Sequence, residues 1–290
     1  MDIIQQRNFT IQRRSGIQKA GLLFPRYLIC VVVAFFVLIP MVVTVIGGFK
    51  TNGELLSSPF SLPRVWQLQN YNTALSQGSF LQTTANSTIV TLATVVLLLL
   101  VGCPAAFVLA RMPFRGREVI FNLILFGLLF PIYMAILPLY ITLRNLQLLD
   151  SLVGVILPQV AYGLPLSVLI LRNFFRAIPR ELEDATYIDG GSQVDFFWRV
   201  LIPLARPSLA VVAMLAMVNS WNNFILPLLV INSASLWTLP LGVMQFQGEY
   251  STDWASTMAF LTLAMIPAII FYLFAERYLI AGLTAGAVKG

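Results

Sequence analysis

The sequence predicts an all-α polytopic membrane protein with six transmembrane helices. Of its 290 residues, 58% are hydrophobic and only 10% are charged, and the mean hydropathy is +0.84. A soluble domain carries about 25% charged residues, so this chain has too few to cover a soluble surface. The apolar residues also form long runs, and a helix needs roughly 20 such residues to cross the hydrocarbon core of a bilayer. These observations exclude a soluble globular fold.

Six apolar runs are long enough to cross the bilayer as helices. In chain order, we expect spans at Tyr27–Phe49, Thr84–Ala110, Val119–Leu143, Ser151–Leu171, Ser208–Ile231 and Met258–Ala275. The first run follows basic residues, as a signal peptide does, but it exceeds the usual h-region of about 7 to 15 residues and no cleavage site ends it. We therefore expect a retained helix. Cys30 and Cys103 lie within spans, where a free thiol behaves as a small apolar residue.

The lysines and arginines predict the orientation, because these residues stay on the cytoplasmic side during insertion. With a cytoplasmic N-terminus and six spans, only Lys50, Arg64 and Arg144 fall outside. Both termini are therefore expected in the cytoplasm. The net charge of +6 is explained by this topology, and no nucleic-acid partner is expected.

The spans lack the groups that harness ion gradients. Proton- or sodium-driven carriers usually place ionisable side chains near the bilayer midplane, and none lies in the six runs. The chain has no histidine, which excludes His-based proton relays and Ser-His hydrolytic sites. It also has no G-x-x-x-x-G-K-[ST] phosphate-binding loop. We predict no catalytic residue, no metal site and no cofactor in this chain, so any energy must come from another polypeptide.

The loop between the fourth and fifth spans is the most informative segment. It contains the polar sequence DATYIDGGSQVDFFWRVLIPLARP at residues 184–207. Pro179 suits a first helical position, the acidic residues after it favour the positive end of a helix, and Gly190 can end that helix in a left-handed cap. A second short helix is expected to start at Ser192, with Asp195 in a capping box, and to stop before Pro203.

Apolar residues of this second helix recur at helical spacing. Phe196, Phe197, Val200 and Leu201 would form one face that needs to be covered. Two short helices joined by glycines in one cytoplasmic loop are typical of a docking element.

At these residues the chain resembles a known family, the permeases of ABC importers. Their signature reads Glu-Ala-Ala, three residues, Gly, nine residues, and Ile-x-Leu-Pro. Here Asp184, Ala185 and Thr186 stand at the first three places, Gly190 stands at the glycine, and Val200 to Pro203 stand at the closing four. Asp replaces the Glu and Thr replaces the second Ala. The segments SWNNFILPLLV, WTLPLGV and ERYLIAGLTAGAVKG are similar to the smaller membrane subunit of maltose-type permeases.

The resemblance implies a type I importer permease in a prokaryotic cell membrane. It divides the chain into a cytoplasmic N-terminal segment at 1–26, a first helix with its outer loop at 27–82, a permease core at 83–281 with a coupling loop at 173–207, and a cytoplasmic tail at 282–290. The implied partners are a homologous second permease subunit, two cytoplasmic ATPases that bind ATP and Mg, an extracytoplasmic sugar-binding protein and a sugar. The residues implied to dock the ATPase are Glu181, Glu183, Asp184, Ala185, Thr186, Asp189, Gly190 and Pro203.

Two further sets of residues are candidates for contacts with the sugar or its binding protein. In relatives of this type, the outer loop that corresponds to residues 232–254 reaches the binding protein, which implies contacts from Trp237, Gln245, Gln247 and Tyr250. The aromatic residues of this loop would equally suit a membrane interface. Uncharged polar residues within the spans could line a path for sugar or could hydrogen-bond helices together, and we favour the second role for most. They are Asn86, Asn122, Gln159, Tyr162, Asn219, Asn222 and Asn223.

Three functions remain open from the sequence. The first is the membrane subunit of an ATP-driven sugar importer. The second is the same architecture importing a peptide, polyamine or phosphate ester. The third is a stand-alone secondary carrier or channel, which the absence of ionisable residues in the spans disfavours.

Overall fold

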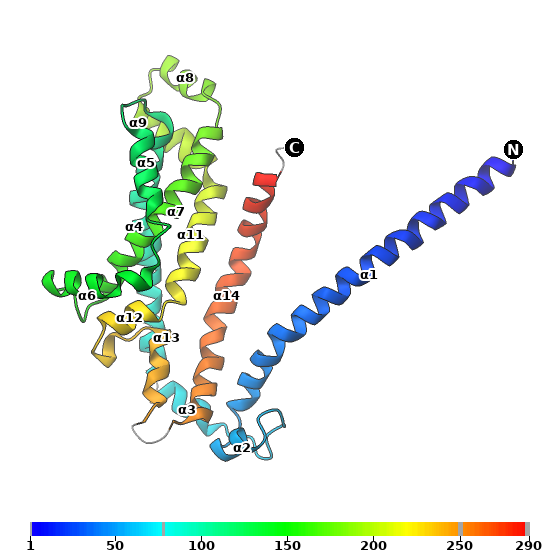
Figure 1. The fold of residues 1–290 in the computed structure, drawn as a ribbon, viewed down its shortest axis with the longest axis vertical. Helices are drawn as coiled ribbons and strands as arrows, with labels where there is room; N and C mark the ends of the chain where they lie inside the picture. Colours follow the sequence, from blue (N-terminus) through cyan, green and yellow to red (C-terminus); the bar gives the residue numbers. More distant parts are fainter. Residues whose placement is uncertain (1, 77–78, 249–251, 288–290) are drawn as a thin grey trace. The chain divides into compact units, whose positions relative to one another are not determined.

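The computed structural model describes residues 2–76, 79–248 and 252–287 (Figure 1). Across these ranges the chain is helical, with a single β-bridge between Gln247 and Thr252. The chain forms two compact units. The first contains residues 1–72 and 253–262, and the second contains residues 73–252 and 263–290.

The first unit is built on α1 (Asp2–Gly47), α2 (Asn52–Ser57) and the first part of α14 (Trp254–Ala287). The loop after α1 is held by Lys50, whose side chain is fully buried. Its Nζ donates to the carbonyl oxygens of Ser58 at 2.8 Å and Pro59 at 2.9 Å. A buried ammonium is tolerated only when its protons are hydrogen-bonded, so these bonds fix the shape of the loop.

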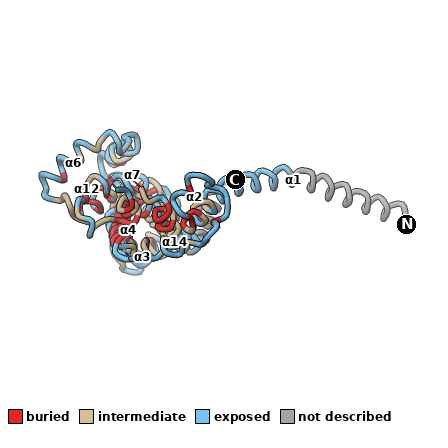
Figure 2. The backbone as a smooth tube through the Cα atoms, turned by 90° about the horizontal axis from the view of Figure 1, so that it is seen from below, coloured by how far each residue is buried: buried red, intermediate tan, exposed pale blue. Residues whose placement is uncertain are grey.

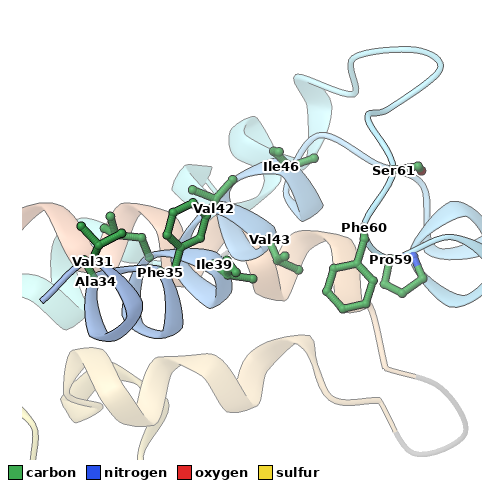
Figure 3. Close-up of a pocket in the computed structure, with 11 residues that line it drawn as sticks. Val31, Ala34, Phe35, Ile39, Val42, Val43, Ile46, Pro59, Phe60 and Ser61 are labelled. Atoms are coloured by element: carbon green, nitrogen blue, oxygen red, sulfur yellow. The ribbon is translucent and has the colours of Figure 1, made fainter. Parts of the chain in front are cut away.

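The segment Pro25–Gly47 of α1 is apolar, and its most apolar 18-residue stretch contains no buried residue. One side of it lines a groove of about 500 Å³, bordered by Phe35, Ile39 and Val42 on the helix and by Phe60 on the following loop (Figure 3). Phe60 is 79% exposed. A helix with so much exposed apolar surface is typical of a segment surrounded by lipid or by another membrane subunit.

The second unit contains most of the helices. They are α4 (Phe80–Arg111), α5 (Arg117–Phe126), η1 (Ile132–Ala135), α6 (Ile136–Asn145), α7 (Leu152–Ala177), α8 (Glu181–Ile188), α9 (Gln193–Asp195), the π-helix η2 (Phe196–Leu201), α10 (Ile202–Leu204), α11 (Arg206–Trp221), α12 (Ile225–Val230), η3 (Ala234–Leu236), α13 (Leu239–Gly242) and η4 (Val243–Phe246); α3 (Gln69–Ser76) connects the two units in sequence. Within this unit, α8 and α9 lie at one end and α12 and α13 lie at the other (Figure 1).

The core of the second unit is the packing of α4 against α7, where buried residues concentrate (Figure 2). The two helices run in the same direction, because contacts advance together along both: Leu98 lies against Gly163, and Leu109 accepts a hydrogen bond from Arg172. A Cβ at Gly163 would lie 3.2 Å from the methyl carbons of Leu98, so the glycine allows this close approach. Because α4 and α7 run in the same direction, the chain must cross back between them, and the segment from α5 to α6 makes this return.

Six continuous spans are not confirmed. In the described part of the chain, four helical segments have the length and apolarity to cross a membrane: Pro25–Gly47, Phe80–Arg111, Leu152–Ala177 and Trp254–Leu273. They correspond to the first, second, fourth and sixth predicted spans. A fifth is reached if Gln193–Leu204 and Arg206–Trp221, which meet at a bend of 74°, are counted as one span.

The third predicted span, 119–143, is broken in the structure. Its first helix ends at Phe126, three tight i to i+3 hydrogen bonds follow at Gly127 to Leu129, and Pro131 precedes η1. Pro131 has no N–H to donate into a continuing helix, which explains why the helix does not continue. A Cβ on Gly127 would lie 2.9 Å from Cγ of Pro165, so this break is also a point of close contact with α7.

The fifth predicted span, 208–231, is also interrupted. The helix α11 ends at Trp221 and α12 begins at Ile225. The two asparagines between them satisfy backbone groups at the break: Asn222 Nδ2 donates to the Val218 carbonyl at 2.9 Å, and Asn223 Oδ1 accepts from the Leu226 N–H at 3.1 Å. Side-chain hydrogen bonds of this kind replace those that a helix end leaves unmade.

Candidate functional site between α7 and α11

The connection from α7 to α11 contains a short helix, α8, that closely matches the expected one. It begins at Glu181 rather than Pro179, with Arg180 as the N-cap, and its first turn carries Glu181, Glu183 and Asp184. It ends at Ile188, and Gly190 follows with φ of +80°. Side chains other than glycine rarely adopt this left-handed conformation, so Gly190 lets the chain reverse directly after the helix.

The helix α8 is almost uncovered. None of its residues is buried, and Ile188 is 85% exposed. The carboxylates of Glu181 and Asp184 are exposed beside it, as are Ala185 and Asp189. An eight-residue helix is marginal on its own, because its stability normally comes from packing of an apolar face. The structure therefore contains a helix that is held at its ends and on one side only.

The inner side of α8 is held by Arg111, the last residue of α4. The Arg111 guanidinium lies 3.6 Å from Oε2 of Glu183 and donates to the Ile178 carbonyl at 2.5 Å. Its side chain is only 4% exposed, and that of Glu183 is 14% exposed. Tyr187 donates its hydroxyl proton to Oε1 of the same carboxylate at 3.0 Å. Glu183 thus faces its own chain, whereas the other acidic residues of α8 face outward.

The segment after Gly190 closes the loop with an apolar face. Ser192 and Asp195 form the predicted capping box, with the Asp195 N–H donating to Ser192 Oγ at 3.2 Å and the Ser192 N–H donating to Asp195 at 3.0 Å. The predicted face is present, since Phe196, Phe197 and Leu201 are buried. Phe197 packs on Phe107 of α4 with ring centroids 5.0 Å apart.

The end of this second helix was predicted incorrectly. The chain does not stop before Pro203 but passes through the π-helix η2 into α10, which ends at Leu204. Pro203 lies at the start of α10, directly after the π-helix, and contributes no N–H to the helical hydrogen bonds.

A second buried arginine lies close to this loop. Arg172 of α7 is 2% exposed; its Nε donates to the Leu109 carbonyl at 2.9 Å, and its guanidinium pairs with Glu118. The same group lies 3.8 Å from the ring centroid of Phe121 in α5. Arg172 therefore joins α7 to both α4 and α5. Sequence reasoning used Arg111 and Arg172 only as indicators of membrane orientation and missed these roles.

The outer-loop candidates occupy a segment that is largely pinned. Trp237 is half-buried against the core, Gln245 is half-buried, Gln247 is exposed in the bridge with Thr252, and Tyr250 lies outside the described residues. Asn86 of α4 donates from Nδ2 to the carbonyl oxygens of Ser235 and Trp237, both at 2.9 Å. Among the described residues of this loop, the stretch around Ser235 and Trp237 is therefore held against α4.

The carboxylate of Asp150 fixes the start of the same loop. Oδ1 accepts from the N–H groups of Asn232 at 3.0 Å and Ser233 at 2.8 Å, and Oδ2 accepts from the Ser233 hydroxyl at 2.5 Å. These hydrogen bonds from the hydroxyl and the backbone of Ser233 hold the pKa of Asp150 below its usual value. Asp150 has φ of +54°, a strained value for a residue other than glycine.

The polar residues of the predicted spans have mixed surroundings. Asn86, Asn222 and Asn223 bond backbone groups of their own chain, as described above. Asn122 and Asn219 are exposed and Tyr162 is half-buried. Gln159 differs, because both polar atoms of its amide are buried without a hydrogen-bond partner among the described residues. A buried amide without partners is costly, so Gln159 has the hydrogen-bonding capacity to serve a ligand or water.

Comparison with known proteins identifies the family. Residues 99–284 match the family described as "Binding-protein-dependent transport system inner membrane component". The diacetylchitobiose uptake permease NgcG of Streptomyces coelicolor is 34% identical over 255 residues, which are 87% of this chain and 84% of that protein. The sulfoquinovosyl glycerol transport permease SmoH of Agrobacterium fabrum is 36% identical over 87% of this chain and 89% of that protein.

Further relatives agree. The arabinooligosaccharide transport permease AraQ of Bacillus subtilis is 34% identical over 87% of this chain and 91% of that protein. A chain of a bacterial ABC transporter involved in the import of alginate has the same fold, with a TM-score of 0.75 over 92% of this chain and 96% of that chain, at 24% identity. The chain therefore belongs to the inner-membrane component family of binding-protein-dependent transport systems, as a multi-pass permease subunit that works with an ATPase and a substrate-binding protein and is itself not an enzyme.

Proposed function

We propose that this chain is the membrane-spanning subunit of an ATP-driven sugar importer. The proposal rests on the solutes for which its relatives are named, all of which are sugars or sugar derivatives. NgcG, AraQ and SmoH are named for a disaccharide derivative, for oligosaccharides and for a sugar glycoside, and each matches 87% of this chain. An importer of a peptide, polyamine or phosphate ester is not favoured by these relatives.

The polar chemistry of the second unit supports a neutral, hydroxyl-rich substrate. Sugars are bound through many uncharged hydrogen bonds, and Gln159, Asn219 and the unbonded atoms of Asn222 and Asn223 supply amides of this type. Asn222 and Asn223 also line a cavity of about 270 Å³ with Tyr133 and Phe224. Breaks in membrane helices are tolerated where they border other protein or an aqueous cavity. We propose that the interrupted third and fifth segments complete a set of six crossings and border the translocation path.

The helix α8 is proposed to be the coupling helix that docks into an ATPase subunit. Its outward side combines the carboxylates of Glu181, Asp184 and Asp189 with the apolar side chains of Leu182 and Ile188. A complementary groove would therefore carry basic residues around an apolar floor. ATP and Mg belong to that partner and supply the free energy of the cycle.

The remaining partners follow from the two-sided layout of a permease. A homologous second permease would complete the path, a second ATPase subunit would dock to it, and both termini of this chain would lie in the cytoplasm. An extracytoplasmic binding protein would deliver sugar near the tip around Gln247 and Thr252. Closure of the ATPases would move α8 and tip the helices from an inward-open to an outward-open arrangement, and hydrolysis would reverse the change.

The test is to reconstitute the chain with its partners in liposomes. We expect binding proteins loaded with sugar to stimulate ATP hydrolysis and to drive uptake of the same sugar. Stimulation by a peptide-, polyamine- or phosphate-ester-loaded binding protein, with none by any sugar, would contradict the sugar assignment. Replacement of the cognate ATPase by a catalytically inactive variant is the control for ATP dependence.

A further inference from the structure

Arg111 connects α8 to a helix that is distant in sequence. The coupling loop is continuous only with α7 and α11, so a push on α8 reaches these two helices through the backbone. Arg111 is the last residue of α4. It lies 67 positions before Ile178, whose carbonyl it contacts, and α8 begins only after that, at Glu181. Its guanidinium is the point where α4 meets the loop.

One side chain contacts all three parts of the loop. The guanidinium donates to the Ile178 carbonyl at the end of α7, pairs with Glu183 on α8 at 3.6 Å, and lies 5.9 Å from the ring centroid of Phe196 in η2. Arginine suits this task because its planar fork carries several donors and also stacks on aromatic rings. A lysine could make the ion pair but not the remaining contacts at the same time.

The surroundings make this contact costlier to break than a surface ion pair. Exposed ion pairs contribute little because water screens them, whereas Arg111 is only 4% exposed and Glu183 only 14% exposed. The α8 helix has no buried residue of its own, so Glu183 is its best-covered charged group. Movement of α8 therefore displaces the partner of a buried guanidinium, which is costly unless α4 moves with it.

We propose that Arg111 is a positioning residue that transmits the displacement of α8 to α4. The inference rests on the proposed function, since it assumes that an ATPase moves α8. It adds a third helix to those driven by the coupling loop. Because α4 packs along α7, and Arg172 of α7 bonds the Leu109 carbonyl two residues before Arg111, the ends of α4 and α7 would move together.

The first test compares Arg111→Gln with wild type in the reconstituted importer. We expect the complex to assemble and to hydrolyse ATP, while sugar imported per ATP falls about tenfold, within the range of coupling changes seen for residues that link two sites. Arg111→Lys should recover part of this ratio and Glu183→Gln should lower it. Arg115→Gln, which removes an exposed positive charge four residues further on, is the matched control and should leave the ratio unchanged.

An unchanged ratio in Arg111→Gln, or a parallel loss of transport and hydrolysis, would overturn the proposal. These results are distinct from failure of the proposed function, in which wild type itself would show no sugar-dependent ATP hydrolysis.

A second test leaves Arg111 and Glu183 unchanged and measures the movement directly. Spin labels at Arg115 and at Arg180, both exposed, report the distance between the end of α4 and the start of α8 in an otherwise intact loop. Cys30 and Cys103 are replaced by alanine so that only these sites are labelled. We expect the distance to stay constant as the complex passes through its nucleotide states, because the two ends move as one. A distance that changes between nucleotide-free and ATP-bound complexes would contradict the link.

Discussion

Gly190 shows how one backbone conformation determines the site. Its φ of +80° lets the chain turn back directly after α8, and apart from Gly190 itself and its two chain neighbours no residue has an atom within 4 Å of the position that a Cβ would take. A substitution there is therefore strained by backbone conformation and not by crowding. Gly116, between α4 and α5, has φ of +84° and an equally open surrounding, which gives a matched control in a turn outside α8.

We predict that Gly190→Val weakens the response of the ATPase to sugar and reduces transport. The strain of about 1 to 2 kcal/mol for a side chain in the left-handed region should shift the end of α8 and lower both transport and sugar-stimulated ATP hydrolysis. Gly116→Val carries similar strain but should affect mainly stability. Uptake and hydrolysis by the two purified complexes measure the difference. Full uptake with unchanged coupling in Gly190→Val would argue strongly against α8 as the lever.

Asp150 predicts a pH dependence of stability. Hydrogen bonds from Ser233 and Asn232 lower the pKa of its carboxyl in the folded protein. The stability that it contributes is therefore fully present above the pKa of the unfolded chain, about 4, and is lost as the pH falls through the lower, folded-state pKa. Thermal unfolding in detergent should show a steeper loss of stability below about pH 4 in wild type than in Asp150→Asn. Parallel curves for the two proteins would contradict this role.

At the scale of elements, hydropathy predicted the long uninterrupted helices and not the breaks. The second span was placed within four residues of its helix at each end, because its apolar run is continuous. The fourth began one residue from its helix but was ended at Leu171, six residues too early, because the charged Arg172 was taken as the end of the span. The third and fifth failed because a hydropathy window measures composition and is insensitive to backbone continuity. Gly127 and Pro131 were the only sequence signals of a break in the third span. Because proline is common within continuous membrane helices, these residues alone did not predict that the helix ends there.

Only the local structure of the coupling loop was predicted from the sequence. The acidic residues at the start of α8, the glycine at its end and the capping box at Ser192 are patterns of neighbouring residues, so the sequence indicates them directly. Glu183 is anchored by Arg111, which lies 72 positions earlier in the sequence. No local pattern encodes such a contact, and an arginine at the end of a span already had an explanation in membrane orientation.

Asn86 tests whether the amides in the spans hold helices together or serve the sugar. Its Nδ2 bonds two carbonyl groups of the outer loop, so Asn86→Ala should leave these partly buried acceptors unpaired and destabilise the protein by about 1 to 3 kcal/mol. We expect a lower midpoint of thermal unfolding with unchanged sugar specificity. Asn122→Ala, at an exposed position of α5, is the control and should have little effect on stability. A stable Asn86→Ala with altered sugar affinity would instead place Asn86 in the translocation path.

At the scale of the whole molecule, the surface proposed to receive energy is separate from the groups proposed to border the path of the solute. The described spans offer uncharged amides, aromatic rings and helix breaks, which suit a neutral solute. The exposed helix α8 offers carboxylates and apolar side chains to a protein partner, and Arg111 joins that helix to α4. Relatives of similar length that serve in sugar uptake share this sequence over most of its extent.

The most direct measurement is sugar accumulation in proteoliposomes with and without the partner ATPase. With the binding protein and an imposed proton or sodium gradient present in both samples, we predict accumulation only when the ATPase and ATP are included. Equal accumulation by liposomes that contain this permease without any ATPase would contradict the central claim that its motion is driven from outside the chain.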